Sequence, residues 1–96
     1  MSMIEVVQVV PQINYDLYVY FDDGKIVRYN ISQLVGKGVF KALENLDFYM
    51  NRCTVMNHAV AWDLSGRYDP RNCVDLAPEV VYEDGISVRD PLQRTA

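Results

Sequence analysis

The segment NYDLYVYFDDGKIVRYNIS, residues 14–32, contains two alternating runs on either side of the acidic turn FDDG. In a β-strand, successive side chains point to opposite faces of the sheet. One face of the first run takes Tyr15, Leu17, Val19 and Phe21, and the other takes Asp16, Tyr18 and Tyr20. The pattern predicts a β-hairpin. The adjacent carboxylates of Asp22 and Asp23 could belong either to its turn or to an active site.

The loop length decides which residues of the second strand are buried. A two-residue loop would place Val19 opposite Arg28 and mix a charge into the apolar face. A three-residue loop, Asp22 to Gly24, places Val19 opposite Val27 and Leu17 opposite Tyr29, and so separates the two faces. Such loops commonly end on a residue in the left-handed region, where glycine carries no steric cost. We therefore predict a three-residue loop with a positive φ at Gly24, and we interpret the acidic pair as turn residues.

The same register sends Tyr18 and Tyr20 to the second face, with Tyr18 opposite Arg28. Tyrosine and arginine are enriched where proteins bind one another. If a helix packs over the first face, Tyr18, Tyr20 and Ile26 are half exposed beside Arg28. Tyr18, Tyr20 and Arg28 are then the candidates for binding a partner. In the alternative, strands from the second half of the chain, with Val60 and Trp62, cover this face as a second core layer.

Outside the hairpin, the pattern predicts a strand over residues 4–11 that ends at Pro11, a turn capped by Ser32, and a helix over residues 39–46 that covers one face of the sheet. Strands starting at residues 49 and 59 flank a turn at Asn57 and His58, with Trp62 in the core. Residues 65–72 read as a loop, followed by a short strand at 73–74 and a helical turn at 78–82. The fold class is α+β, a small antiparallel sheet of hairpins with one short helix on one face and a C-terminal helical turn. Residues 1–83 form a single domain, and residues 84–96 form a flexible tail.

Composition excludes several classes of partner. The chain has 96 residues and a net charge of −4 without a basic run, so direct binding of nucleic acid is not expected. The N-terminus lacks the pattern of a secretion signal, and no apolar stretch is long enough to cross a membrane. We expect a cytoplasmic protein that does not bind membranes.

The residues that carry chemistry are sparse. His58 is the single histidine. Its spacing from Cys53 and Cys73 matches no metal-binding motif, so neither a metal nor a cofactor is expected. The cysteines are expected to be reduced. Gly-rich phosphate loops and a nucleophile elbow are absent from the sequence, so we expect no enzyme activity. Polar groups do gather in sequence after Trp62, at Asp63, Tyr68, Asp69 and Arg71, and these would be the residues of a small enzyme if there is one.

Four segments together carry a family resemblance: the FDDG hairpin, GVFKALEN at 38–45, AWDLSGRYD at 61–69 and VDLAPEVVYE at 74–83. With them the chain, over roughly residues 4–83, resembles the bacterial family called domain of unknown function 2442. The resemblance implies a compact α+β domain and brings no established catalytic residues. Some relatives continue into a helix-turn-helix that binds DNA, but the thirteen residues after Glu83 are too few for one. Others are encoded beside a second small protein, which implies an antitoxin-like or regulatory partnership.

Three functions follow as hypotheses. The first is a non-catalytic interaction module that binds a protein partner or itself through Tyr18, Tyr20 and Arg28 or through a strand edge. The second, implied by the resemblance, is an accessory or antitoxin-like regulator whose partner is the product of a neighbouring gene. The third is the small enzyme with its polar site at residues 63–71.

Overall fold

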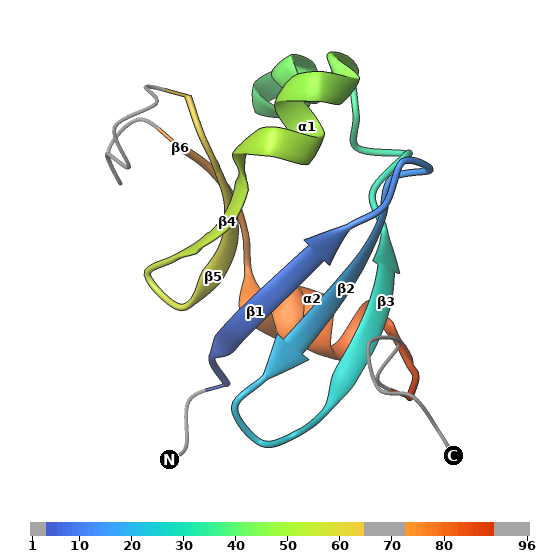
Figure 1. Cartoon of the computed structure of the whole chain (residues 1–96), viewed down its shortest axis with the longest axis vertical. Coiled ribbons are helices and arrows are strands. Elements are labelled where there is room, and N and C mark those ends of the chain that lie inside the picture. Colours follow the sequence, from blue (N-terminus) through green and yellow to red (C-terminus); the bar gives the residue numbers. More distant parts are fainter. Residues whose placement is uncertain (1–3, 65–72, 90–96) are drawn as a thin grey trace.

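Two antiparallel sheets form the framework of the protein (Figure 1). The structure is a computed structural model, and it describes residues 4–64 and 73–89. The first sheet has the strand order β1-β2-β3-β7 and the second the order β4-β5-β6. The strands are β1 (Val6–Pro11), β2 (Asp16–Phe21), β3 (Ile26–Asn30), β4 (Cys53–Met56), β5 (Ala59–Asp63), β6 (Cys73–Leu76) and β7 (Ile86–Ser87). The helices are the 3-10 helix η1 (Gly38–Glu44), α1 (Leu46–Arg52) and α2 (Pro78–Asp84). The predicted α+β class is confirmed.

The β2–β3 hairpin has the register that its sequence predicts. Leu17 pairs with Tyr29, and Val19 pairs with Val27. The loop closes because the backbone N–H of Gly24 donates to the carbonyl of Phe21 at 3.0 Å, and Gly24 has a φ of +92°. The three-residue loop and the positive φ are therefore both confirmed.

The core lies between the two sheets and α2. Leu17, Val19 and Val27, on the inner face of the first sheet, are fully buried. They form one cluster with residues of the second sheet and of the helices: Val60, Trp62, Leu76, Val81, Leu43 and Tyr49. Trp62 is thus in the core, as predicted. The alternative in which Val60 and Trp62 cover the face of Tyr18 and Tyr20 is wrong, because both pack with the inner face.

The helices differ from the prediction. Residues 38–44 form a 3-10 helix, and the α-helix begins only at Leu46, where the side chain of Asn45 accepts a hydrogen bond from the N–H of Phe48 at 3.1 Å. Residues 49–52 of the predicted strand are instead the second half of α1, where Tyr49 is a buried helical residue, while residues 53–56 form strand β4 as predicted. The helix that covers the inner face is α2, which lies behind β2 and β3 in Figure 1 and contacts β3. The turn after β3 is capped by Asn30 and not by Ser32, whose N–H donates to the Asn30 side chain at 3.0 Å.

The C-terminal part of the chain adds a strand to the first sheet. In β7, Ile86 pairs with Arg28 and Ser87 with Val27, and the N–H of Val88 donates to the carbonyl of Ile26 at 2.9 Å. The predicted boundary after Glu83 therefore falls inside α2, and residues 84–89 belong to the fold. Of the predicted tail, only residues 90–96 lie outside the described residues.

Three aromatic side chains, Tyr15, Tyr49 and Trp62, join the two sheets through α1, and we call them the aromatic joint. The rings of Tyr15 and Tyr49 are 4.6 Å apart, and those of Tyr49 and Trp62 are 6.1 Å apart and stacked. The Trp62 Nε1–H donates to the Tyr49 carbonyl at 3.0 Å, and the Tyr49 hydroxyl donates to the Asp16 carbonyl at 3.2 Å. Tyr15 has a φ of 67°, an unfavourable conformation for an aromatic residue, and its hydroxyl donates to the Leu43 carbonyl at 2.8 Å. The joint thus connects α1 to both sheets.

None of the helices in the described part of the chain is both long and apolar enough to span a membrane.

Candidate functional site

The face of the first sheet that points away from the core carries two rows of side chains, each crossing all four strands. The strand pairings set the rows. The first row is Val10, Tyr18, Arg28 and Ile86. The second row is Gln8, Tyr20, Ile26 and Val88, where Val88 continues the β3–β7 register through its bond to Ile26. These eight residues are the outer face.

The outer face is unusually apolar for a face that points away from the core. Antiparallel sheets with one solvated face usually alternate apolar residues inward with polar residues outward. In these two rows, besides the two tyrosines, only Gln8 and Arg28 are polar, and the outward pair Asp16 and Asn30 borders the rows at one end. Ile86 is 58% exposed, while Val10, Tyr18, Tyr20, Ile26 and Val88 are half-buried. In Figure 1, α2 lies behind the first sheet and no labelled helix or strand crosses in front of it, so no element of the described chain covers the outer face.

The structure brings together the three residues that the sequence proposes for partner binding. Tyr18 is paired directly with Arg28, and Tyr20 lies in the next row. Gln8, Val10, Ile86 and Val88 are members that sequence reasoning missed. The signal for Ile86 and Val88 was the short alternation GISV at residues 85–88, which is too brief to predict a strand without knowledge of its partner β3.

Of the four residues of the proposed polar loop, only Asp63 is among the described residues. Asp63 is only 3% exposed at the end of the central strand β5. Tyr68, Asp69 and Arg71 lie outside the described residues. Within residues 4–64 and 73–89, no three His, Cys, Asp or Glu side chains are grouped so that they could hold a metal ion. Cys53 is a free thiol, and burial raises its pKa to about 12, so it is a poor nucleophile at neutral pH.

The two carboxylates of the FDDG turn hold two different neighbours. Asp23 accepts a hydrogen bond from the Tyr82 hydroxyl of α2 at 2.6 Å and another from the Lys25 N–H at 2.9 Å. The Lys25 ammonium lies 3.9 Å from the centre of the Tyr82 ring and donates to the Tyr82 carbonyl at 3.1 Å. The FDDG turn and the VVYE segment of the family resemblance are therefore in direct contact, and this contact attaches α2 to the hairpin.

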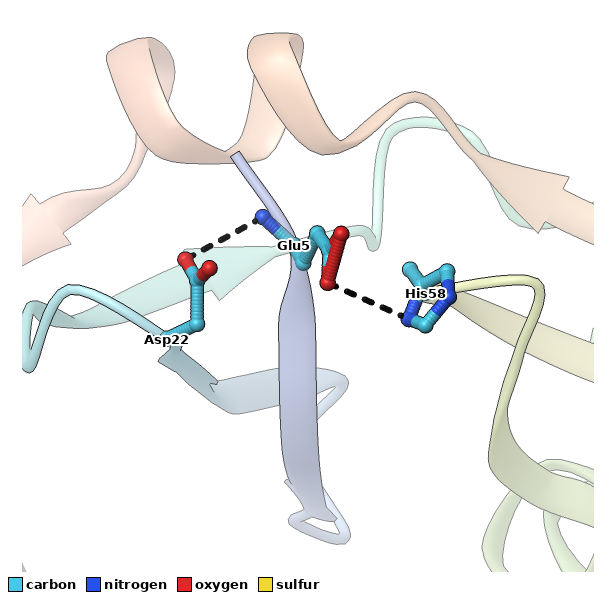
Figure 2. Close-up of polar contacts among 3 residues, drawn as sticks. All are labelled: Glu5, Asp22 and His58. Atoms are coloured by element: carbon cyan, nitrogen blue, oxygen red, sulfur yellow. Dashed lines mark hydrogen bonds and ion pairs between the residues drawn. The ribbon is translucent and has the colours of Figure 1, made fainter. Parts of the chain in front are cut away.

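Asp22 faces the start of β1 instead (Figure 2). Its N–H donates to the Glu5 carbonyl at 2.9 Å, and its carboxylate accepts from the Glu5 N–H at 3.4 Å. The Glu5 carboxylate lies 3.5 Å from Nδ1 of His58, whose side chain is 70% exposed. A pair this exposed contributes little to stability. His58 lies in the predicted turn with Asn57, and both residues have positive φ.

The contact between Asp23 and Tyr82 predicts a pH dependence. The Tyr82 hydrogen bond, followed by that of the Lys25 N–H, lowers the pKa of Asp23 from its ordinary value of 3.8. Because the pKa is lower in the folded state, the stabilisation is present above pH 3.8 and is lost as the pH falls through the folded pKa. We expect Asp23→Asn to lower the melting temperature at neutral pH, and the difference from the wild type to shrink in acid. Thermal unfolding between about pH 7 and pH 3 measures this.

Two further variants make this test specific. Tyr82→Phe removes the main cause of the pKa shift and should reduce the same acid-dependent difference. Asp22→Asn removes one negative charge from the same turn without touching Tyr82, and so controls for net charge. A difference between Asp23→Asn and wild type that stays constant down to the lowest pH would contradict the assigned contact.

The fold defines a small α+β domain built of two antiparallel sheets that share one core. The family model described as Protein of unknown function (DUF2442) matches residues 6–87, and the chain belongs to this family. The match includes β7, which completes the outer face. Comparisons with curated proteins and with solved structures found no match.

Proposed function

We propose that this protein is a non-catalytic interaction module and that it binds a protein through the outer face. The observation that carries the proposal is the apolar and aromatic character of the outer face across all four strands, with no described element over it. Contiguous apolar patches on a small protein mark interaction sites more often than scattered apolar residues do. The inner face already has its own core, so the outer face is not needed to complete it.

The chemistry of the outer face suits a protein partner. Tyr18 and Tyr20 offer large rings with few rotatable bonds, and Arg28 is an exposed cation paired with Tyr18. Such residues concentrate binding energy at the centre of an interface, and weakly contributing residues surround them. Ile86 and Val10 lie at the two ends of the same row and extend the apolar contact on either side.

A capture experiment tests the proposal. The purified chain is immobilised and tested against two defined proteins: a second copy of itself, and the product of any gene adjacent to its own. A lysate of its source is tested in the same way. The same is done with a Tyr18→Ala, Arg28→Ala double variant. Loss of two central anchors should weaken binding by roughly tenfold or more.

The control replaces an exposed apolar residue elsewhere. Leu46, at the start of α1, is 42% exposed and lies outside the outer face, so Leu46→Ala should bind like the wild type. The proposal fails if neither the chain itself nor any other protein binds in a way that the double variant weakens and Leu46→Ala does not.

A further inference from the structure

We propose that the outer face binds a second copy of the same chain, related by a two-fold axis that runs parallel to the strands and between β2 and β3. The inference rests on the proposed function, because it takes the outer face to be a docking surface and names its occupant. Two-fold interfaces require one surface to complement itself, so that residue i meets residue j and residue j meets residue i. The rows of the outer face meet this requirement.

The first row is complementary to itself about that axis. Tyr18 on β2 and Arg28 on β3 lie on either side of the midline, and Val10 on β1 and Ile86 on β7 lie at the two ends. The two-fold operation exchanges the two sides of the row. Each Tyr18 ring then lies against Arg28 of the other copy, and each Val10 against Ile86.

The second row follows the same rule. Tyr20 and Ile26 are paired across the midline, so each tyrosine ring meets the isoleucine of the other copy. Gln8 and Val88 occupy the ends. Two sheets packed face to face lie about 10 Å apart with their strands nearly aligned, as in a β-sandwich, and side chains from both faces fill that gap.

Charge favours a second copy over an unrelated apolar partner. Arg28 is the only charged residue of the outer face, and a partner that buried it without an electron-rich group would leave a cation unpaired. In the two-fold arrangement each guanidinium meets a tyrosine ring, which attracts cations. The two Arg28 side chains stay on opposite sides of the axis. Asp16 is the outward residue that precedes Tyr18 on β2, so its carboxylate lies beside the position of the partner's arginine; it also accepts from the Asn30 amide at 2.8 Å.

The area of the outer face sets the expected affinity of the dimer. Four strands about 4.8 Å apart and two outward rows about 7 Å apart cover roughly 270 Å² on each copy. This is well below the roughly 800 Å² per partner of a standard stable interface. The dimer should therefore be weak and should form only as the protein concentration rises.

Sedimentation velocity over a wide concentration range tests self-association with a matched pair of variants. Ile86→Glu places a charge on the outer face, and Leu46→Glu places the same charge at an exposed apolar position outside it. The sedimentation coefficient of the wild type and of Leu46→Glu should rise with concentration. Ile86→Glu should stay at the monomer value.

Cross-linking with a short bismaleimide tests the two-fold axis itself. Val10→Cys and Ile86→Cys chains should cross-link when mixed, because the two positions face each other. Neither variant should cross-link alone, because each position is displaced sideways from its own copy by three strand spacings, about 14 Å, in addition to the gap between the sheets. The wild-type chain, with its native cysteines, is the control.

The outcomes separate the inference from the proposed function. A chain that stays monomeric, but captures another protein in a manner that Ile86→Glu weakens, overturns the second copy and leaves the interaction module intact. A monomer with no binding that depends on the outer face overturns both. A dimer that Ile86→Glu does not weaken, or one that cross-links through Val10→Cys alone, overturns the two-fold arrangement.

Discussion

A Trp62→Ala variant is expected to lose about 3–5 kcal/mol of its free energy of unfolding. Trp62 is fully buried in β5, its ring stacks on Tyr49, and its indole N–H donates to the Tyr49 carbonyl. Truncation opens a large cavity and leaves that carbonyl without its buried donor. Because a small domain has only roughly 5–15 kcal/mol in total, the variant should lie near the limit of folding. Urea denaturation followed by far-UV circular dichroism measures the loss.

Two control variants separate the loss of buried volume from the loss of the indole hydrogen bond and from truncation of an exposed side chain. Trp62→Phe keeps an aromatic ring in the core but removes the indole donor, so it should lose less than Trp62→Ala. Leu64→Ala truncates an apolar side chain that follows β5 but is 42% exposed, and it should cost less than about 1 kcal/mol. Equal stability of Trp62→Ala and Leu64→Ala would show that the aromatic joint does not hold the two sheets together.

The β2–β3 hairpin was predictable because its information is local. The alternation in residues 15–31 assigns each side chain to a face, and only one loop length keeps charge off the inner face. The φ of Gly24 and the pairing of Tyr18 with Arg28 then follow from the same choice. This is why the sequence could identify the centre of the outer face.

The helices were harder because their patterns are short and their environment is tertiary. In α1, seven residues long, Tyr49 is buried by contacts with Tyr15 and Trp62, which are distant in sequence. A short apolar run of this kind suits a strand or a buried helix equally well. The local clue was Asn45, a good N-cap residue followed by Asp47 in the first turn.

The edge of the outer face that β7 forms could not be predicted, because it too depends on contacts between residues distant in sequence. β7 has only two residues and exists as a strand through its pairing with β3. The sequence therefore predicts Ile86 and Val88 in a flexible tail, and only the pairing of β7 with β3 places them in the sheet. The outer face depends on α2 and Gly85 to bring β7 to β3.

A Gly85→Ala variant tests that dependence and is expected to cost about 1–3 kcal/mol. A Cβ at position 85 would lie 2.7 Å from the Val81 carbonyl oxygen and 2.9 Å from Val27, and the backbone oxygen cannot rotate away. Because Gly85 joins α2 to β7, the adjustment should move β7 from β3. Urea denaturation gives the stability, and hydrogen exchange of the Val88 N–H, which donates to Ile26, reports the position of β7.

Gly24→Ala is the matched control for this variant. Position 24 has open space around it but a φ of +92°, so alanine there costs about 1–2 kcal/mol through backbone conformation alone. Both variants should be less stable than the wild type, but only Gly85→Ala should speed exchange of the Val88 N–H beyond its loss of global stability, and only it should weaken binding through the outer face. Wild-type stability and a protected Val88 amide in Gly85→Ala would mean that β7 is held in the sheet without the close approach of Gly85 to Val27.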